Sequence, residues 1–283
     1  MLDRVFTGHV RKQVPDRRWE NQVVDEATGE QGRRATSGWP ERLWIVRHGQ
    51  SAGNVARDYA ESSGAPLIEL EHRDADVPLS ALGERQSQAL GAWVRALPAA
   101  QQPTLCLSSP YERSRQTAYA VMSALTREQD DVVADERLRE KEFGVLDRYT
   151  RKGIIEKFPD LAEQRKLVGK FYFRPPGGES WCDVVFRLRS VLSDLQCNHA
   201  GERVMVVGHQ VIVNCFRYLI EKMDEATILA IDREGDVPNC GITEYAATAD
   251  GKGLALQRTN FVAPLLDAGT PVTRESDRPA GAR

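Results

Sequence analysis

The chain has 283 residues, of which 41% are hydrophobic and 28% are charged, and its formal net charge is -3. This composition is typical of an ordinary globular protein, and the length suits one large domain or two small ones. The charge gives no basis for nucleic-acid binding, and no apolar run is long enough for a membrane span or a signal-peptide core. We therefore expect a cytoplasmic protein that binds neither nucleic acid nor membranes.

Five cysteines are scattered along the chain without the CxxC spacing of a zinc or redox motif. We expect them to be reduced thiols, as is usual in the cytoplasm. The sequence also shows no cluster of His, Cys, Asp and Glu with metal-ligand spacing, so we expect neither a metal nor a cofactor.

Residues 1–40 mix acidic and basic residues with little apolar periodicity, which predicts a flexible N-terminal extension. The following run, 43–46, is apolar and rich in β-formers, as a buried parallel strand would be. It ends abruptly at Arg47, His48 and Gly49. Arginine and histidine can bind or attack a phosphate, and we expect the glycine to let the backbone approach such a ligand closely.

Alternating helix and strand patterns follow the first strand. They predict a short helix near 54–59, a helix that Ser80 caps and Pro98 ends, a strand at 104–108, a helix at 112–125 and a strand at 132–138. A βαβαβ order of this kind is typical of a parallel sheet with helices on both faces.

Residues 139–178 interrupt the alternation and contain one clear helical pattern, near 151–158. An insertion of this length near a sheet edge often supplies a lid or substrate loop, so we interpret it as a small cap. The alternation then resumes with a helix from Ser180, a strand at 204–208, a helix from 211 to about 222, and a hairpin of strands 242–246 and 254–258.

The predicted architecture is a single α/β domain over residues 41–266, with a doubly wound, mostly parallel sheet and helices on both faces. The Pro-, Gly- and charge-rich segment 267–283 predicts a disordered C-terminal tail.

Polar residues follow three of the predicted strands. Arg47 and His48 follow the first, Arg113 and Arg115 lie just beyond the second, and His209 ends the fourth. Because parallel strands share an orientation, their carboxyl ends lie along one edge of the sheet. His209 also precedes a helix, whose N-terminus favours anions. The two arginines are two residues apart on a helix, so at most one of them reaches a common pocket.

These segments resemble the histidine phosphatase superfamily, which includes phosphoglycerate mutases and fructose-2,6-bisphosphatases. The matching stretches, in the family's order, are RHGQSAGN at 47–54, LSSPYERSRQTA at 107–118, LREKEFGVLD at 138–147, PPGGESWCDVVFRLR at 175–189 and VMVVGHQVIVN at 204–214. They span residues 42 to about 247. The GHQ is similar to the bisphosphatases, since mutases usually have a GHG-type ending, whereas PPGGES is also similar to the mutases.

The resemblance implies a phosphoglycerate mutase-like fold and a role for each matching residue. His48 corresponds to the nucleophile that becomes phosphohistidine. Glu140 corresponds to the acid that protonates the leaving oxygen and then activates water. Arg47, Arg113 and His209 correspond to the remaining residues of the phosphate pocket.

Four assignments have alternatives. Asn54, with Ser51, either contacts the phosphate or only stabilises its loop. Gln210 donates to phosphate from its backbone or its side chain. Glu142 is a rival to the acid two residues before it. Glu179 either orients an arginine or histidine of the pocket or favours the start of the helix that follows it.

The expected function is metal-independent hydrolysis of a phosphomonoester on a small phosphorylated metabolite, through phosphohistidine at His48. One alternative is a mutase-type phosphotransferase, and another is a non-catalytic protein that binds a phosphorylated ligand. A binding protein would need the arginines but not the acid Glu140. The substrate stays open, because it depends on cap residues such as Arg165 and Lys166. The oligomeric state also stays open, and a homodimer is possible.

Overall fold

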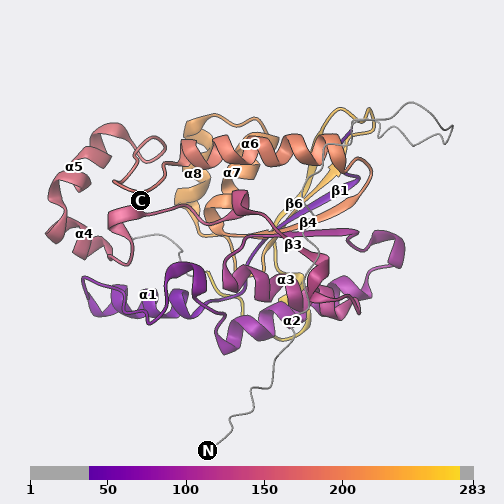
Figure 1. Ribbon diagram of the computed structural model, residues 1–283, viewed down its shortest axis with the longest axis horizontal. Coiled ribbons are helices and arrows are strands. Elements are labelled where there is room, and N and C mark those ends of the chain that lie inside the picture. Colours follow the sequence, from indigo (N-terminus) through magenta and orange to yellow (C-terminus); the bar gives the residue numbers. More distant parts are fainter. Residues whose placement is uncertain (1–37, 275–283) are drawn as a thin grey trace, which may run out of the picture. The chain divides into compact units, whose positions relative to one another are not determined.

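The computed structural model describes residues 38–274, so the predicted extension lies almost wholly outside the described residues, as does 275–283. Within the described range, six strands form one sheet in the order β3-β2-β4-β1-β5-β6 (Figure 1). The strands are β1 (Arg42–Arg47), β2 (Leu105–Ser108), β3 (Val132–Ala134), β4 (Arg203–Gly208), β5 (Ile242–Ala247) and β6 (Leu254–Phe261).

The α-helices of the same range include every helix that the sequence predicts and three more, α5, α8 and α9. They are α1 (Ala52–Ser63), α2 (Ala81–Ala96), α3 (Glu112–Ala124), α4 (Arg151–Lys157), α5 (Pro159–Val168), α6 (Trp181–Asn198), α7 (Gln210–Ile220), α8 (Glu225–Glu234) and α9 (Ala263–Asp267). None of them is both long and apolar enough to cross a membrane.

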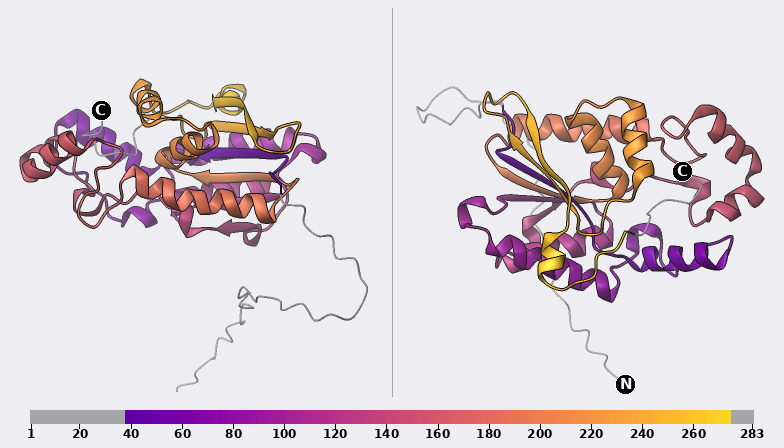
Figure 2. Two further views of the ribbon diagram at one scale, coloured as in Figure 1. Left: turned by 90° about the horizontal axis from the view of Figure 1, so that it is seen from above. Right: turned by 180° about the vertical axis from the view of Figure 1, so that it is seen from behind.

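The side chains of β1 alternate between the two faces of the sheet. Leu43 and Ile45 belong to one buried core, to which α6, α7 and α8 contribute. Trp44 and Val46 belong to a second core, formed with α2, α3 and α9. The two groups of helices therefore cover opposite faces of the sheet, as Figures 1 and 2 show. The predicted doubly wound α/β fold is confirmed.

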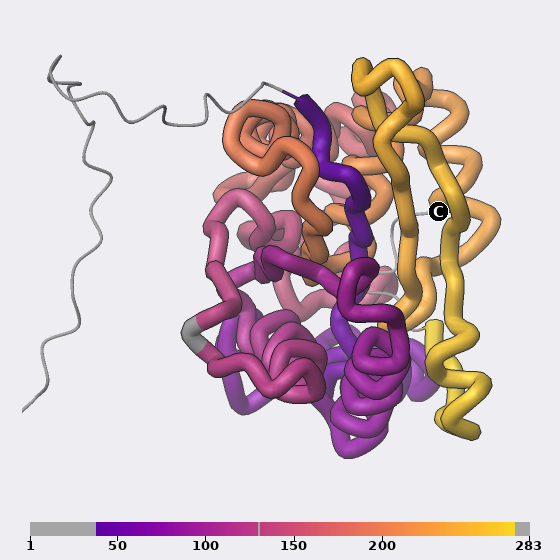
Figure 3. Tube along the Cα trace, turned by 90° about the vertical axis from the view of Figure 1, so that its right-hand side faces the viewer, coloured from indigo at the N-terminus to yellow at the C-terminus, as the bar shows by residue number. Residues whose placement is uncertain are grey.

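The sheet is mixed. Strands β3, β2, β4 and β1 run parallel, whereas β5 and β6 form an antiparallel hairpin along one edge, next to β1 (Figure 3). Arg47 pairs with Gly208, and Ser108 pairs with Val207. The carboxyl ends of the three central parallel strands are thus in register, as the sequence pattern predicts.

The cap has two helices, α4 and α5, where the sequence shows one clear pattern. Leu146, Ile154 and Phe173 form a small buried cluster of its own. Helix α5 begins with Pro159, which has an ordinary position in a first turn, and none of its residues is buried. The expectation of a single helix was therefore wrong. A helix that buries no face lacks the regular spacing of apolar residues by which a helix is predicted from sequence.

The chain beyond β6 also differs from the prediction. Helix α9 continues to Asp267, and the segment 268–274 is hydrogen-bonded to the domain. The backbone N–H of Asn239 donates to Thr273 O at 3.0 Å, and Gln86 Nε2 donates to Pro271 O at 2.9 Å. Residues 267–274 therefore belong to the domain rather than to a disordered tail.

Candidate active site

The site is assembled where β1, β2 and β4 end. His48 directly follows β1, and its backbone N–H donates to Gly208 O at 2.9 Å. His209 directly follows β4 and is the N-cap residue of α7. The two imidazole rings are stacked edge to face with their centroids 5.2 Å apart, and both side chains are fully buried. Adjacent parallel strands therefore bring together two histidines that are 161 positions apart in the sequence.

The hydrogen bonds of His48 define which of its ring nitrogens can react. Nδ1 lies 2.6 Å from Gly49 O, and because a carbonyl only accepts, Nδ1 carries the proton. In a neutral imidazole this leaves the lone pair on Nε2, which accepts a hydrogen bond from Arg113 Nε at 3.3 Å. His48 thus presents a nucleophilic nitrogen beside a guanidinium group.

The loop after His48 is held by packing against helix α2. A Cβ on Gly49 would lie 2.6 Å from Gly83 O, and the Gly49 N–H donates to Thr117 Oγ1 at 3.0 Å. The expected reason for this glycine was close approach to a ligand. In the structure the backbone of Gly83 approaches it, which is a packing reason for glycine here, and the approach of a ligand stays a prediction. Asn239 Nδ2 donates to His48 O at 3.1 Å and secures the same loop from the other side.

Arg113 and Arg115 point to different places, as their spacing on α3 predicts. Arg113 is buried beside His48 and forms an ion pair with Asp74 at 3.1 Å, and its guanidinium lies 5.0 Å from the centroid of the Tyr111 ring. Arg115 instead donates to Tyr119 Oη at 3.0 Å on the exposed side of the helix. The arginine of the site is therefore Arg113.

Arg47 is the second guanidinium at this edge of the sheet. Its side chain is fully buried, and Nη1 donates to Val237 O at 2.5 Å. Its backbone pairs with Gly208 and Gly241. Two arginines from different elements can contact different oxygens of one phosphate.

His209 faces the predicted acid. Its Nδ1 lies 3.8 Å from Glu140 Oε2, and its Nε2 lies 2.8 Å from Ser109 Oγ. Glu140 Oε1 accepts the backbone N–H of Lys141 at 2.7 Å. Since the His48 and His209 rings are in contact, the His209 ring lies between Glu140 and the nucleophile.

Glu142 occupies a different environment. Its side chain is 45% exposed, whereas that of Glu140 is 1% exposed. Its carboxylate accepts a hydrogen bond from Tyr111 Oη at 3.0 Å and pairs with Arg139 at 3.8 Å. The geometry therefore favours Glu140 as the acid, and Glu142 acts as an anchor for Tyr111.

The carboxylate of Glu179 is bound by two arginines other than Arg47. It accepts from Arg139 at 2.7 Å and from Arg187 Nε at 3.0 Å. Arg187 in turn donates to the backbone carbonyls of Arg139 and Glu140, at 2.8 and 3.3 Å. The pair Glu179–Arg187 thus holds the backbone on which Glu140 is mounted.

Asn54 and Gln210 stay predictions as phosphate ligands. Asn54 forms a capping box with Ser51 at the start of α1, in which each side chain accepts the other residue's backbone N–H. Gln210 Nε2 donates to Asp236 Oδ1 at 2.6 Å. These bonds support a role of both side chains in shaping the loops. The Gln210 backbone lies at the start of α7, the end of a helix that favours anions.

Three residues that contact the site were not predicted from the sequence. Asp74 pairs with Arg113 from a polar loop, Ser109 contacts His209, and Asn239 holds the backbone of His48. Ser109 lies within the matched segment and could have been noticed there. The other two follow only from the tertiary contacts.

Comparison with known proteins agrees with this geometry. A model of the histidine phosphatase superfamily (branch 1) matches residues 43–260. The chain belongs to this superfamily. The membership that the sequence motifs predict is therefore confirmed.

As a member of the histidine phosphatase superfamily, the chain is similar to phosphatases and to mutase-like proteins. It is 28% identical over 232 residues to a phosphoglycerate mutase-like protein of Arabidopsis thaliana, a match that covers 75% of this chain and 76% of that protein. Among solved structures, "Mycobacterial hydrolase 1" is 25% identical with a TM-score of 0.61 and is matched over 78% of this chain and 99% of its own.

A mycobacterial glucosyl-3-phosphoglycerate phosphatase has the same fold, at 24% identity and a TM-score of 0.60, over 78% of this chain and 98% of its own. The superfamily thus includes phosphatases and mutases, and the structural neighbours named here include enzymes of the hydrolase kind.

Proposed function

We propose that this protein hydrolyses the phosphomonoester of a small phosphorylated metabolite through a phosphohistidine on His48. One observation carries the proposal. The lone pair of His48 Nε2 accepts a hydrogen bond from Arg113, and Glu140 lies beside His209 in the same site. The arginines and His209 neutralise the phosphate oxygens, which allows a neutral imidazole to approach phosphorus.

In the first step His48 Nε2 attacks phosphorus, and the bond from phosphorus to the ester oxygen breaks. Glu140 gives its proton to that oxygen, so the leaving group departs as an alcohol rather than an alkoxide. In the second step the ionised Glu140 takes a proton from water, whose oxygen attacks phosphorus. The P–N bond breaks, and inorganic phosphate and free His48 are restored.

The alternatives make different demands on the same residues. A non-catalytic binder needs Arg47 and Arg113 but gains nothing from a buried carboxyl beside His209. A mutase uses the same first step but must protect its phosphohistidine from water until a second hydroxyl arrives. The mutase-like relative in Arabidopsis thaliana keeps this second candidate open.

A quench experiment tests the proposal, and a parallel one with 3-phosphoglycerate separates it from the mutase. With 4-nitrophenyl phosphate in ¹⁸O-labelled water, we expect an acid-labile, base-stable phosphoprotein and one labelled oxygen per phosphate released. His48→Ala should lose the phosphoprotein and at least about 10³-fold in kcat. The control is His199→Ala, which removes a histidine paired with Glu202 at the other end of α6.

Full activity in His48→Ala would contradict the mechanism. If, with 3-phosphoglycerate as the substrate, the phosphoprotein passes its phosphoryl group between glycerate positions faster than it releases phosphate, the protein is a mutase.

A further inference from the structure

A cavity of about 370 Å³ is lined in part by the segments that carry the proposed acid and His209. Its walls come from the cap helices α4 and α5 and from the first turns of α6 and α7. Lys141, which directly follows Glu140, and Val211, two residues after His209, both line it. The volume lies in the range of small-molecule pockets. This position, next in sequence to the acid and close to the second histidine, makes the cavity the candidate site for the organic group of an ester.

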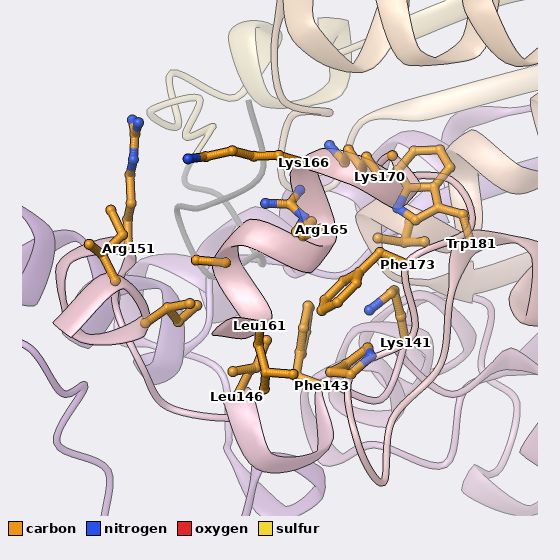
Figure 4. Close-up of a pocket in the computed structure, with 16 residues that line it drawn as sticks. Lys141, Phe143, Leu146, Arg151, Leu161, Arg165, Lys166, Lys170, Phe173 and Trp181 are labelled. Atoms are coloured by element: carbon orange, nitrogen blue, oxygen red, sulfur yellow. The ribbon is translucent and has the colours of Figure 1, made fainter. Parts of the chain in front are cut away.

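The walls of the cavity are largely apolar and aromatic. The side chains of Phe143, Phe173 and Trp181 lie around it (Figure 4), together with Leu146 and Ile154. Trp181, Phe173, Leu146 and Ile154 are buried in the domain and so are fixed in place. A polar substrate such as a short sugar acid would leave this surface without a partner, whereas a ring or branched hydrocarbon would cover it.

The charged residues of the cavity are all basic. Among its sixteen lining residues there is no Asp or Glu, and the cations are Lys141, Arg151, Arg165, Lys166 and Lys170. Lys170 pairs with the buried Asp232, so its charge is compensated. Lys166 pairs with Glu163 at 2.9 Å, but both side chains are mostly exposed and such a pair is weak. Figure 4 shows Arg165 beside Lys166 on the α5 side of the cavity.

Building on the proposed phosphatase, we propose that the substrate's leaving group is amphipathic. It has an apolar body of ring size, which fills the cavity next to Glu140, and a second anionic group, which pairs with Arg165. Two separate features carry the two parts: the aromatic wall selects the body, and the purely basic charge of the lining selects the anion. The inference excludes small, wholly polar phosphoesters such as 3-phosphoglycerate as preferred substrates.

Matched probes test each part. The kcat/KM values of phenyl phosphate, 2-naphthyl phosphate, 6-carboxy-2-naphthyl phosphate and 3-phosphoglycerate would be compared. We expect a gain of about tenfold for the second ring, from its buried apolar area. The carboxylate should add about tenfold more, as one charge-assisted hydrogen bond does. The corresponding arylmethyl phosphonates, which cannot be hydrolysed, give the same order by calorimetric binding.

Variants locate the anion site. Arg165→Ala should remove the roughly tenfold preference for the carboxylated naphthyl compound over 2-naphthyl phosphate. Ile155→Asp puts a negative charge on the half-exposed rim, where Ile155 is 52% exposed, and should reduce the preference about fivefold. The matched control is Leu167→Asp on α5, which is 80% exposed and does not line the cavity.

Equal values for the two naphthyl compounds, or a preference for 3-phosphoglycerate, would overturn the inference. An unchanged preference in Arg165→Ala would overturn the assignment of the anion to that residue. If no ester is hydrolysed but the phosphonates bind in the expected order, the cavity assignment stands and the phosphatase proposal fails.

Discussion

Lys141 lies between the proposed acid and the cavity. Its backbone N–H binds the Glu140 carboxylate, and its ammonium group lies 4.6 Å from the centroid of the Phe143 ring. Burial lowers the pKa of Lys141 from its ordinary 10.5 to about 8, because the charged form loses its hydration. The folded protein therefore carries a buried cation that is only partly charged above neutral pH.

This pKa predicts the effect of Lys141→Met on stability. Between pH 8 and 10.5 the unfolded chain binds the proton and the folded chain does not, so the stability of the wild type rises with pH there. At pH 7 the difference between 10.5 and about 8 corresponds to about 3 kcal/mol of destabilisation. Lys141→Met should therefore be more stable than the wild type at pH 7, and the difference should narrow by about 2 kcal/mol at pH 10.

Urea unfolding at the two pH values measures this, with the exposed Lys157→Met as the control. A variant less stable than the wild type at pH 7 would show that the ammonium group gains more from its neighbours than it loses through burial. We expect the same variant to bind anionic substrates less tightly, since it removes a cation next to Glu140.

A second prediction at the level of single residues separates Glu140 from Glu142 as the leaving-group acid. Glu140→Gln should slow phosphohistidine formation from an alkyl phosphate by about 10²–10⁴-fold, because the alkoxide then leaves without a proton. The loss should be much smaller with 4-nitrophenyl phosphate, whose leaving group needs no proton. Rapid-quench measurement of the phosphoprotein gives both rates.

Glu142→Gln is the matched control for this test. It keeps the shape of the side chain and weakens only the bonds to Tyr111 and Arg139. If the dependence on the leaving group appears in Glu142→Gln and not in Glu140→Gln, then the acid is Glu142.

At the scale of elements, the segment after α9 supports the nucleophile. Thr273 Oγ1 donates to Asn239 Oδ1 at 2.9 Å and accepts from Gln86 Nε2 at 2.9 Å. Asn239 then donates to His48 O. A chain of side-chain hydrogen bonds thus connects a segment near the end of the described chain to the backbone of the nucleophile.

We expect Thr273→Val to lower kcat several-fold with little change in KM, because Asn239 loses a partner and the His48 loop becomes less well held. Thr273→Ser, which keeps the hydroxyl, should restore the rate. Thr248→Val is the control: it removes a hydroxyl bonded to Asp250 and Gly253 in the turn between β5 and β6. It should cost similar stability, read by urea unfolding, without a change in kcat. An equal loss of kcat in both variants would mean that Thr273 acts only through global stability.

The helices differ in how well the sequence predicts them. Helices α2 and α6 have apolar residues at helical spacing and serine N-caps, Ser80 and Ser180, so their starts were predictable. Helix α5 has no buried residue and was missed. Helix α8 has only Ile228 and Asp232 buried, which is too sparse a stripe to detect, although Asp224 caps it.

At the scale of the whole molecule, the described domain separates the candidate phosphate site from the cavity. The edge of the parallel sheet supplies His48, Arg113 and His209, which come from strand ends and an adjacent helix. The cap supplies most of the cavity beyond Glu140. Because the cap has its own small core, its walls can change without disturbing the phosphate site. The same arrangement suits a family whose members share chemistry and differ in substrate.

The sequence by itself predicted the six strands, the direction of the parallel sheet and the residues that meet at its edge, although the third strand, expected at 132–138, ends at Ala134 and a short 3-10 helix, Glu136–Leu138, follows it. These follow from short-range patterns: apolar runs that end in polar residues, and motifs whose order matches one superfamily. The pairing of Arg113 with Asp74, the Thr273–Asn239–His48 chain and the contact of Gly49 with Gly83 were decided only by the tertiary structure. Each joins residues that are far apart in the sequence and individually ordinary, so no local pattern marks them. The basic cavity has the same origin, because its walls come from separate helices that only folding brings together.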